Sequence, residues 1–519
     1  MQLNRKYGFL NFLLVLLCLF FFNVIASQYF FRLDLTEEKR YAISDNSKII
    51  LQNVDDVVFV EIFLEGDLPP GFKRLQRSIR ETLDEFRVYS GANIQYKFTD
   101  PLAEKDERQK AKVFMDLAER GLQPTNLFAN ENGKQTEKLI FPGAIISYKG
   151  REVPVLLLKG AAGAAPGEVL NQSVEGVEFE LISAMKKLSD VNRKRIGILE
   201  GHGELSNMEL DDIYRTLKES YLVDRVNLSV IKNLYEYFDV LVIAKPVKYF
   251  SEEDKLKIDQ FIVKGGRVLF LLDKVQVDEK KLGTKENLAV ATELNLDDLL
   301  FRLGARINNT LIQDMQSGAL PMVVGMMGDK PQTQLVPWRY FVVHTAFSKH
   351  PVVRNMSAVY AHFISSIDTV KSKGITKTPL MFTSRYVKVM TAPFPVELNE
   401  AKKQPDPNEF NRSPIITGVL LEGVFRSIYT NRLTEEKMDS IQFKSSGLPS
   451  KVIVFSDGDL IRNDVSPEGN QTYPLGFDKY MRKKFANKDL IENCITFLAD
   501  ENGIINTRSK EIKLRPLDK

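Results

Sequence analysis

The chain has 519 residues, of which 44% are hydrophobic and 27% are charged, values ordinary for a folded globular protein. Its 71 Lys and Arg residues nearly balance its 68 Asp and Glu residues, which argues against a dedicated nucleic-acid-binding protein. The two cysteines, Cys18 and Cys494, give no disulfide framework, and the four scattered histidines give no metal-ligand signature. We therefore expect no metal and no cofactor.

The N-terminal segment predicts a membrane anchor. Gly8 to Ala26 are 19 residues without a charge, about the length of helix that crosses a bilayer. Arg5 and Lys6 precede this run, and positive flanks remain in the cytoplasm, so the rest of the chain is expected outside it. The alternative is a signal peptide cut before Ser27, which exports the same remainder. We take residues 1–32 as a cytoplasmic stub with an uncleaved anchor.

Residues 33–190 predict a small mixed α/β domain. Ser44 is expected to cap a short helix, and Lys149-Gly150-Arg151 marks the turn of a hairpin. The expected order of strands and helices is typical of the thioredoxin-like class, but no CxxC motif accompanies it, so redox chemistry is not expected. The expected strands are 56–64, 94–98, 143–148 and 152–158, and the expected helices are 72–89, 104–120 and 176–188.

Residues 195–519 predict a doubly wound parallel sheet. Short apolar runs alternate with helical patterns, as they do in buried parallel strands connected by helices. The run 451–455 is expected to return to this sheet, which makes residues 301–443 a β-rich insertion. The other expected strands are 196–199, 223–227, 238–244 and 267–272.

Candidate binding residues follow two of these strands. Ligands of open α/β sheets bind beyond the carboxyl ends of the strands, where glycines let backbone N–H groups approach an anion. The alternative for this glycine-rich segment is a purely structural turn. No GxSxG elbow and no GxxxxGK[ST] loop occurs, so no catalytic residue is assigned. The candidates are Glu200, Gly201, His202, Gly203 and Glu204 after the first strand, and Asp457 and Asp459 after the last.

Three segments together carry a resemblance to a known family. They are LDLTEEKRYAIS (33–44) after the apolar run, EGHGEL (200–205), and KVIVFSDGDLIRND (451–464) with the closing NKDLIENCITFLADENGI (487–504). The pattern resembles the auxiliary ABC-transporter proteins, in particular the gliding-motility-associated substrate-binding group GldG. The juxtamembrane residues that carry part of this resemblance are Leu33, Asp34, Leu35, Thr36, Arg40 and Tyr41.

The resemblance implies a protein of the bacterial inner membrane with its bulk in the periplasm. Its implied partners are an ABC permease (GldF-like) and a cytoplasmic ATPase (GldA-like). The second α/β domain is then similar to glutamine-amidotransferase-like folds without their nucleophile. The family usually carries a second membrane helix at its C-terminus, whereas this sequence ends in the polar segment KEIKLRPLDK. Either the sequence stops before that helix, or this member has a single anchor.

Three functions remain open from the sequence. The first is a non-enzymatic auxiliary subunit that mediates assembly or coupling of an ABC-transporter complex, with α/β domains that bind a partner or a cell-envelope ligand. The second is a true periplasmic solute-binding protein with a cleft beside the Glu200–Glu204 segment. The third is a cryptic hydrolase that uses His202 and Asp457, which lacks a recognisable nucleophile.

Overall fold

The computed structural model describes most of the chain. The described residues are 12, 14–21, 43–103, 105–131, 134–159, 165–189, 193–282, 287–328, 330–412, 414–466, 468–469, 471–500 and 503–509. The chain divides into two compact units, one formed by Met1–Ala42 and Lys510–Lys519 and the other by Ile43–Ser509. The second unit contains every labelled helix and strand that is described below.

About half of the predicted anchor lies outside the described residues. Residues 12 and 14–21 are helical, whereas the rest of 8–26, the juxtamembrane motif 33–41, Arg5 and Lys6 lie outside them. Within the part of the chain that the structure describes, no helix is both long and apolar enough to cross a membrane. The anchor therefore stays a prediction.

The N-terminal lobe, residues 43–189, contains a four-stranded mixed sheet in the order β2-β1-β5-β6. Strand β1 pairs with β2 in parallel and with β5 antiparallel, and β5 pairs with β6 antiparallel. The elements of this lobe are α2 (Asp45–Gln52), β1 (Val58–Ile62), α3 (Pro70–Tyr89), β2 (Ile94–Phe98), α4 (Glu107–Glu119), β3 (Thr125–Glu131), β4 (Lys134–Ile140), β5 (Gly143–Tyr148), β6 (Arg151–Leu156) and α5 (Pro166–Ser189).

Local signals placed several of these elements correctly. The Ser44 hydroxyl accepts a hydrogen bond from the backbone N–H of Ser47 at 3.2 Å, so the predicted N-cap of α2 is confirmed. Lys149 and Gly150 both have positive φ, as a two-residue hairpin turn requires between β5 and β6. Helix α5 begins at Pro166, ten residues earlier than expected, because proline suits the first helical position.

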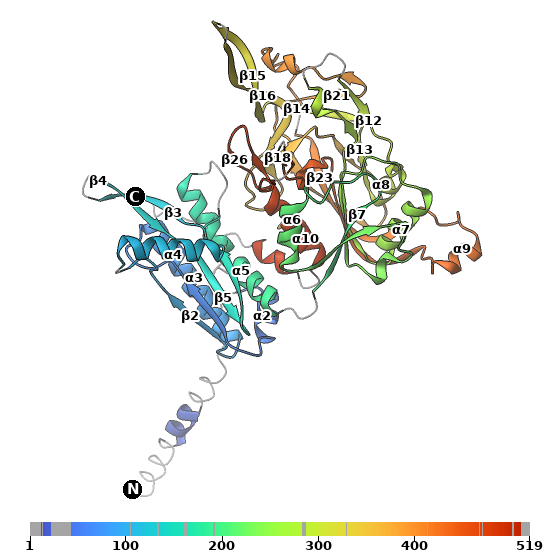
Figure 1. The fold of residues 1–519 in the computed structure, drawn as a ribbon. Helices are drawn as coiled ribbons and strands as arrows, with labels where there is room; N and C mark the ends of the chain where they lie inside the picture. The colour runs from blue at the N-terminus through green and yellow to red at the C-terminus, as the bar shows by residue number, and fades with distance from the viewer. Residues whose placement is uncertain are drawn as a thin grey trace, which may run out of the picture. The chain divides into compact units, whose positions relative to one another are not determined.

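The C-terminal lobe, residues 193–509, is built on one eight-stranded sheet (Figure 1) in the order β17-β20-β23-β24-β10-β9-β7-β8. The five strands from β24 to β8 are parallel, which confirms that the chain returns after a long excursion to complete the parallel sheet. The strands are β7 (Arg195–Glu200), β8 (Leu222–Asn227), β9 (Val240–Ala244), β10 (Arg267–Leu271), β17 (Ala346–Phe347), β20 (Ile375–Phe382), β23 (Ile416–Arg426) and β24 (Ser446–Phe455).

Helices cover both faces of the parallel part of this sheet. On one face, Val240 and Val242 of β9 belong to the same core as residues of α6 (Asp211–Lys218) and α10 (Asn487–Ala499). On the other face, Leu241 and Ile243 join α7 (Glu252–Val263) and α8 (Asp297–Leu303), as Figure 1 shows. Each such side chain, fully buried, contributes about 1.5–3 kcal/mol. The strands are therefore apolar on both faces, the property from which the sequence predicted them.

Part of the β-rich segment that was predicted as an insertion at about 301–443 joins the main sheet. Strands β17, β20 and β23 come from that segment: β23 pairs antiparallel with β24, β20 with β23, and β17 with β20. The reason is that β23 is buried over Thr417–Leu421 and takes the hydrogen bonds that an exposed edge of β24 would leave unpaired.

The remaining short elements pack against this sheet or against one another, and the β15–β16 hairpin extends away from them (Figure 1). They are η1 (Leu234–Glu236), β11 (Val275–Gln276), η2 (Glu279–Lys281), β12 (Leu288–Ala291), β13 (Ala305–Ile307), β14 (Thr310–Asp314), β15 (Ser317–Met327), β16 (Lys330–His344), β18 (Val359–His362), β19 (Ile367–Thr369), β21 (Val387–Thr391), β22 (Phe394–Pro395), η3 (Leu398–Lys402), α9 (Glu435–Ser440), η4 (Asp459–Ile461), β25 (Phe477–Asp478), β26 (Lys483–Lys484) and η5 (Ile504–Ser509).

Candidate functional site

Charged side chains gather at the carboxyl ends of three neighbouring parallel strands. Lys245 directly follows β9, Asp273 follows β10 by two residues, and Asp457 and Asp459 follow β24. Because β9, β10 and β24 are adjacent and parallel, their carboxyl ends meet at the same edge of the sheet. This edge is where open α/β sheets place their ligands.

Lys245 is the cation at the centre of this cluster. Its Nζ lies 3.1 Å from Asp273 Oδ2 and 2.5 Å from Asp459 Oδ2. Burial by itself lowers the pKa of Lys245, but the two carboxylates outweigh it, and the net shift is upward. The lysine therefore stays charged and neutralises two acids that are themselves largely buried.

Asp457 is the most deeply buried acid of the cluster, with 1% of its surface exposed. Its carboxylate oxygens accept hydrogen bonds from the backbone N–H of His362 at 2.8 Å and of Asp459 at 2.6 Å. Burial raises the pKa of Asp457 well above its ordinary value, and the charges of Asp459 and Asp273 raise it further. Asp457 thus binds a proton more readily than its neighbours and ties two other segments to the end of β24.

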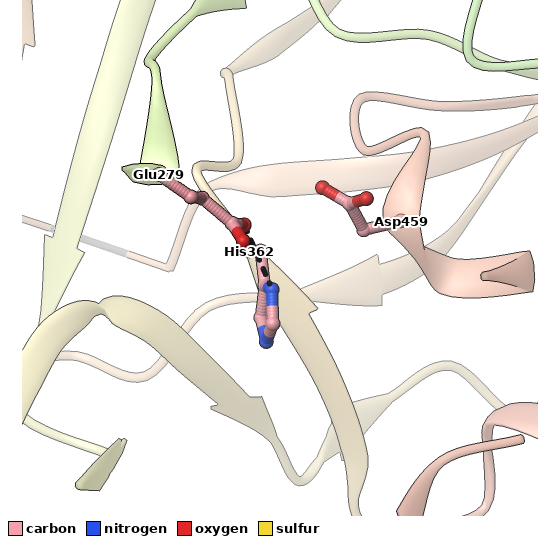
Figure 2. A group of neighbouring side chains, drawn as sticks. All are labelled: Glu279, His362 and Asp459. Atoms are coloured by element: carbon pink, nitrogen blue, oxygen red, sulfur yellow. Dashed lines mark ion pairs between the residues drawn. The ribbon is translucent and has the colours of Figure 1, made fainter. Parts of the chain in front are cut away.

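A second layer of side chains connects the cluster to solvent. Arg462 Nη1 lies 2.9 Å from Asp459 Oδ1, and Arg462 Nη2 lies 3.4 Å from Glu279 Oε1. The His362 Nδ1 lies 3.5 Å from the same Glu279 oxygen (Figure 2). Burial raises the pKa values of Glu279 and Asp459, but the neighbouring cations lower both by more, so both acids stay ionised.

These residues form one wall of a cavity of about 270 Å³. Aromatic side chains of Phe341, Tyr360 and Phe477 form further parts of the wall. No serine, threonine or cysteine is among the described residues that line it. The cavity can therefore bind a small polar or charged species, and a hydroxyl nucleophile of serine or threonine or a cysteine thiol is not among its described lining residues.

Comparison with known proteins places the chain in a family. A family model described as "ABC-type uncharacterized transport system" matches residues 193–494, more than half of the sequence. The chain belongs to this ABC-type transport family. A second model, a domain of unknown function (DUF7088), matches residues 37–147 and so most of the N-terminal lobe. The protein is therefore an auxiliary protein of an ABC transport system, which implies partnership with transporter components.

Two further similarities add less to this assignment. An uncharacterized protein of Borreliella burgdorferi is 21% identical over 468 residues, which are 86% of this ABC-transport protein and 85% of the relative. Among solved structures, the mmIFT52 N-terminal domain is 11% identical, covers 59% of this chain and 96% of its own, and aligns with a TM-score of 0.34. This score is too low to support a statement about fold.

The two groups of binding residues that the sequence analysis named have different contact partners. His202 stacks on Phe250, with ring centroids 3.8 Å apart, and its Nε2 lies 3.3 Å from Asp254. Its backbone N–H donates to Glu204 at 2.7 Å. Burial lowers the pKa of His202, but Glu204 and Asp254 raise it by more. No hydrogen bond or ion pair among the described residues joins His202 to Asp457 or Asp459, so a shared pocket finds no support in these contacts.

The glycines of the 200–204 segment serve the backbone turn. The carbonyl of His202 accepts hydrogen bonds from the backbone N–H groups of Val247 and Lys248, which hold the turn against the segment after β9. Gly203 has φ +75°, and a Cβ there would lie 2.5 Å from Val247 Cγ2. Gly201 also has a positive φ, and Glu200 pairs with Arg225 at 3.2 Å. These contacts favour the structural alternative for this segment.

We expect Gly203→Ala to lower the free energy of unfolding by about 1–3 kcal/mol, because alanine would be strained at this φ and crowd Val247. The matched control is Gly176→Ala on α5, where a Cβ meets nothing within 4 Å. Helix propensity predicts that this control is neutral or slightly stabilising. Urea denaturation measures both, and equal stabilities would contradict the role of Gly203.

Sequence reasoning found two members of the cluster and missed the others. Asp457 and Asp459 follow a strand directly, which is the signal that named them. Glu279, His362 and Arg462 are separated by more than 80 residues from one another and share no motif. Only the pairing of β10 with β24 and the docking of β18 bring them together. Lys245 and Asp273, which directly follow the predicted strands 238–244 and 267–272, were the further signals available.

Proposed function

We propose that this protein is a membrane-anchored, extracytoplasmic and non-catalytic auxiliary subunit of an ABC-transporter complex, which mediates assembly or coupling. The observation that carries the proposal is the family match over 193–494 in a chain whose N-terminus is an uncharged apolar run behind Arg5 and Lys6. The partners would be an ABC permease and a cytoplasmic ATPase, GldF-like and GldA-like in the resemblance to GldG. The resemblance also suggests that the complex serves gliding motility or secretion.

The chemistry of the candidate site supports a non-catalytic role. Lys245 and Arg462 already pair with Asp459, and Arg462 also contacts Glu279, so these acids act mainly as partners of fixed cations. A general base, by contrast, needs a free lone pair within reach of a substrate. The hydrolase alternative relied on His202 with Asp457, and these two residues have separate partners.

The ends of the folded body suit attachment at one place. The side-chain amide of Asn46, in α2, donates a hydrogen bond to the carbonyl of Gly503 at 2.8 Å. The segments through which the chain enters and leaves the body therefore lie side by side.

The strand order of the N-terminal lobe, with one parallel and two antiparallel pairs, supports a thioredoxin-like assignment for that lobe.

Co-purification tests the proposal. We expect the tagged full-length protein, extracted from membranes in mild detergent, to retain an ABC permease and a cytoplasmic ATPase. A variant lacking residues 1–32 is the control, and it should lose the permease if the anchor contributes to the contact. Recovery of the full-length protein alone, under conditions that keep other ABC complexes intact, would refute the proposal.

The charges before the apolar run are expected to set its orientation. In the double variant Arg5→Glu and Lys6→Glu we expect impaired insertion or an inverted anchor, because positive residues stay on the cytoplasmic side. Protease added to spheroplasts measures the result, since a misoriented body is protected. The variant with Lys105→Glu and Lys112→Glu in the folded body changes the charge equally and should behave as the parent.

The alternative function, a periplasmic solute-binding protein, rests on the cavity of about 270 Å³ beside Asp459. That volume is slightly below the usual range for ligand pockets, about 300–1,000 Å³. A solute that binds only the folded state must raise its melting temperature. A screen of sugars, amino acids and short peptides that gives no such increase counts against this function, and a saturable increase favours it.

A further inference from the structure

We propose that Glu279, His362 and Asp459 form a binding site for one divalent transition-metal cation of the zinc or manganese type, with water as its remaining ligands. The three residues come from η2, β18 and η4, and they face one another across one end of the cavity (Figure 2). Each can offer one ligand atom, and these three atoms all lie within 4.8 Å of one another.

The residues around the site carry more negative than positive charge. The cavity is lined by four carboxylates (Glu279, Asp459, Asp464, Asp478) and by two cations (Arg462, Lys479). Three further neighbours of Asp459 do not line the cavity: the carboxylates Asp273 and Asp457 and the cation Lys245. With them, the group has six carboxylates and three cations. Even if Asp457 carries a proton, five negatively charged side chains remain against three positively charged ones. Partly buried carboxylates in excess are expected to attract a cation.

Two ligand atoms lack hydrogen bonds that would explain their burial. His362 Nδ1 and Asp459 Oδ1 are inaccessible to solvent, and neither has a hydrogen-bond partner among the described residues, although each has an ionic neighbour. Buried polar atoms of this kind usually have a partner, which can be an ion. The side chain of Asp459 is only 5% exposed, and its orientation is fixed by Lys245.

The imidazole of His362 is held in a fixed orientation before any ion arrives. It stacks on Phe341 with ring centroids 3.9 Å apart and an angle of 10°, and it meets the edge of Tyr360 at 4.8 Å. Its Nδ1 points toward Glu279 (Figure 2). A neutral imidazole in this orientation offers a lone pair to a metal ion, and a ligand already in place binds with a smaller entropic cost.

The mixed donor set selects the kind of metal. An imidazole nitrogen with two carboxylates suits zinc or manganese, whereas magnesium and calcium prefer sites made of oxygen alone. The neighbouring carboxylates Asp273 and Asp457 also lie near Asp459 in a possible ligand group, but Lys245 occupies the space between Asp273 and Asp459. The side that faces the cavity is therefore the one open to an ion.

Arg462 is the competitor of the metal. It contacts both Asp459 and Glu279, so an incoming ion must displace part of this contact, and Asp464 is the acid that attracts Arg462 from the other side. The competition gives the proposal a distinctive consequence. Removing the arginine charge should strengthen metal binding, while removing any of the three ligands should weaken it.

Titration calorimetry of the chelator-treated full-length protein in detergent, with ZnCl2 and MnCl2 as the probes, tests the site. We expect saturable binding of one equivalent to the parent, and at least roughly tenfold weaker binding to Glu279→Gln and to His362→Gln, since even outer-shell partners change affinity by 10–100-fold. Arg462→Gln is expected to bind at least as tightly as the parent. MgCl2 in excess should not compete.

The matched control is Asp464→Asn, which removes one carboxylate from the same cavity without touching the three ligands. It should lose clearly less affinity than Glu279→Gln, because Asp464 acts on the ion only through its charge and through Arg462. Melting curves establish that each variant is folded before its titration. No saturable binding to the parent, or an equal loss of affinity in Asp464→Asn and Glu279→Gln, would overturn the site, since the second result describes diffuse attraction of cations. Neither outcome bears on co-purification with the transporter.

Discussion

Replacing Lys245 by Met is expected to lower the free energy of unfolding by about 3–5 kcal/mol, the cost of breaking a buried ion pair by removing one partner. Lys245 is the cation that lies between Asp273 and Asp459, and its own side chain is 20% exposed. Methionine keeps the length of the aliphatic stem but leaves two buried carboxylates without that counter-charge. The structure around the ends of β9, β10 and β24 should therefore be the first to lose stability.

Urea denaturation followed by circular dichroism measures this loss. The control is Lys248→Met, three residues further along the chain, where the side chain is exposed and its removal should change stability by less than about 0.5 kcal/mol. Adding Asp273→Asn to Lys245→Met should restore part of the loss, because it removes one of the uncompensated charges. If Lys245→Met and Lys248→Met unfold at the same urea concentration, the cluster does not stabilise the sheet edge.

Acid is expected to destabilise the fold through His344. This side chain on β16 is 1% exposed, and its Nδ1 donates to the carbonyl of Phe382 at 2.8 Å. Burial lowers the pKa of His344 from 6.5 to about 4. Since the unfolded chain then binds the proton more readily, this stability is fully present above pH 6.5 and is lost as pH falls from 6.5 toward 4. The loss amounts to roughly 3 kcal/mol.

His344→Asn separates this contribution from other titrating groups. The asparagine amide can donate to Phe382 from a position near that of Nδ1, but it does not titrate. We expect parent and variant to differ little at pH 7.5, and the parent to lose about 3 kcal/mol more than the variant between pH 6.5 and pH 4. His350, whose pKa burial also lowers to about 4, titrates equally in both proteins. Parallel stability profiles would show that His344 is not the acid-sensitive group.

The sequence predicted those parts of the fold that local pattern determines. Strands β9 and β10 are short runs of Val, Leu, Ile and Phe, and burial on both faces gives such runs directly. The helical spacing of Leu75, Ile79 and Leu83 likewise predicted the buried face of α3. The β3–β4 hairpin was missed because its strands are largely polar, and polar strands give no periodic signal.

The features that the sequence did not predict depend on pairing between segments far apart in the chain. Nothing in the sequence of β23 shows that it pairs antiparallel with β24, so the sequence predicts only a β-rich insertion around it. The candidate site is also only partly predictable from the sequence. Asp457 and Asp459 could be identified because they follow a predicted strand, whereas Glu279 and His362 lie on short elements that have no sequence pattern of their own. The glycines of the 200–204 segment illustrate the opposite case, a visible motif whose contacts are those of a turn.

The compartment of the folded body is the point on which the transporter role depends most directly. Protease added to intact spheroplasts expressing the full-length protein, followed by detection of the body 43–509 and of a cytoplasmic marker, measures it. The account predicts that the body is digested while the cytoplasmic marker survives. A body that stays intact until the spheroplasts are lysed would contradict the account.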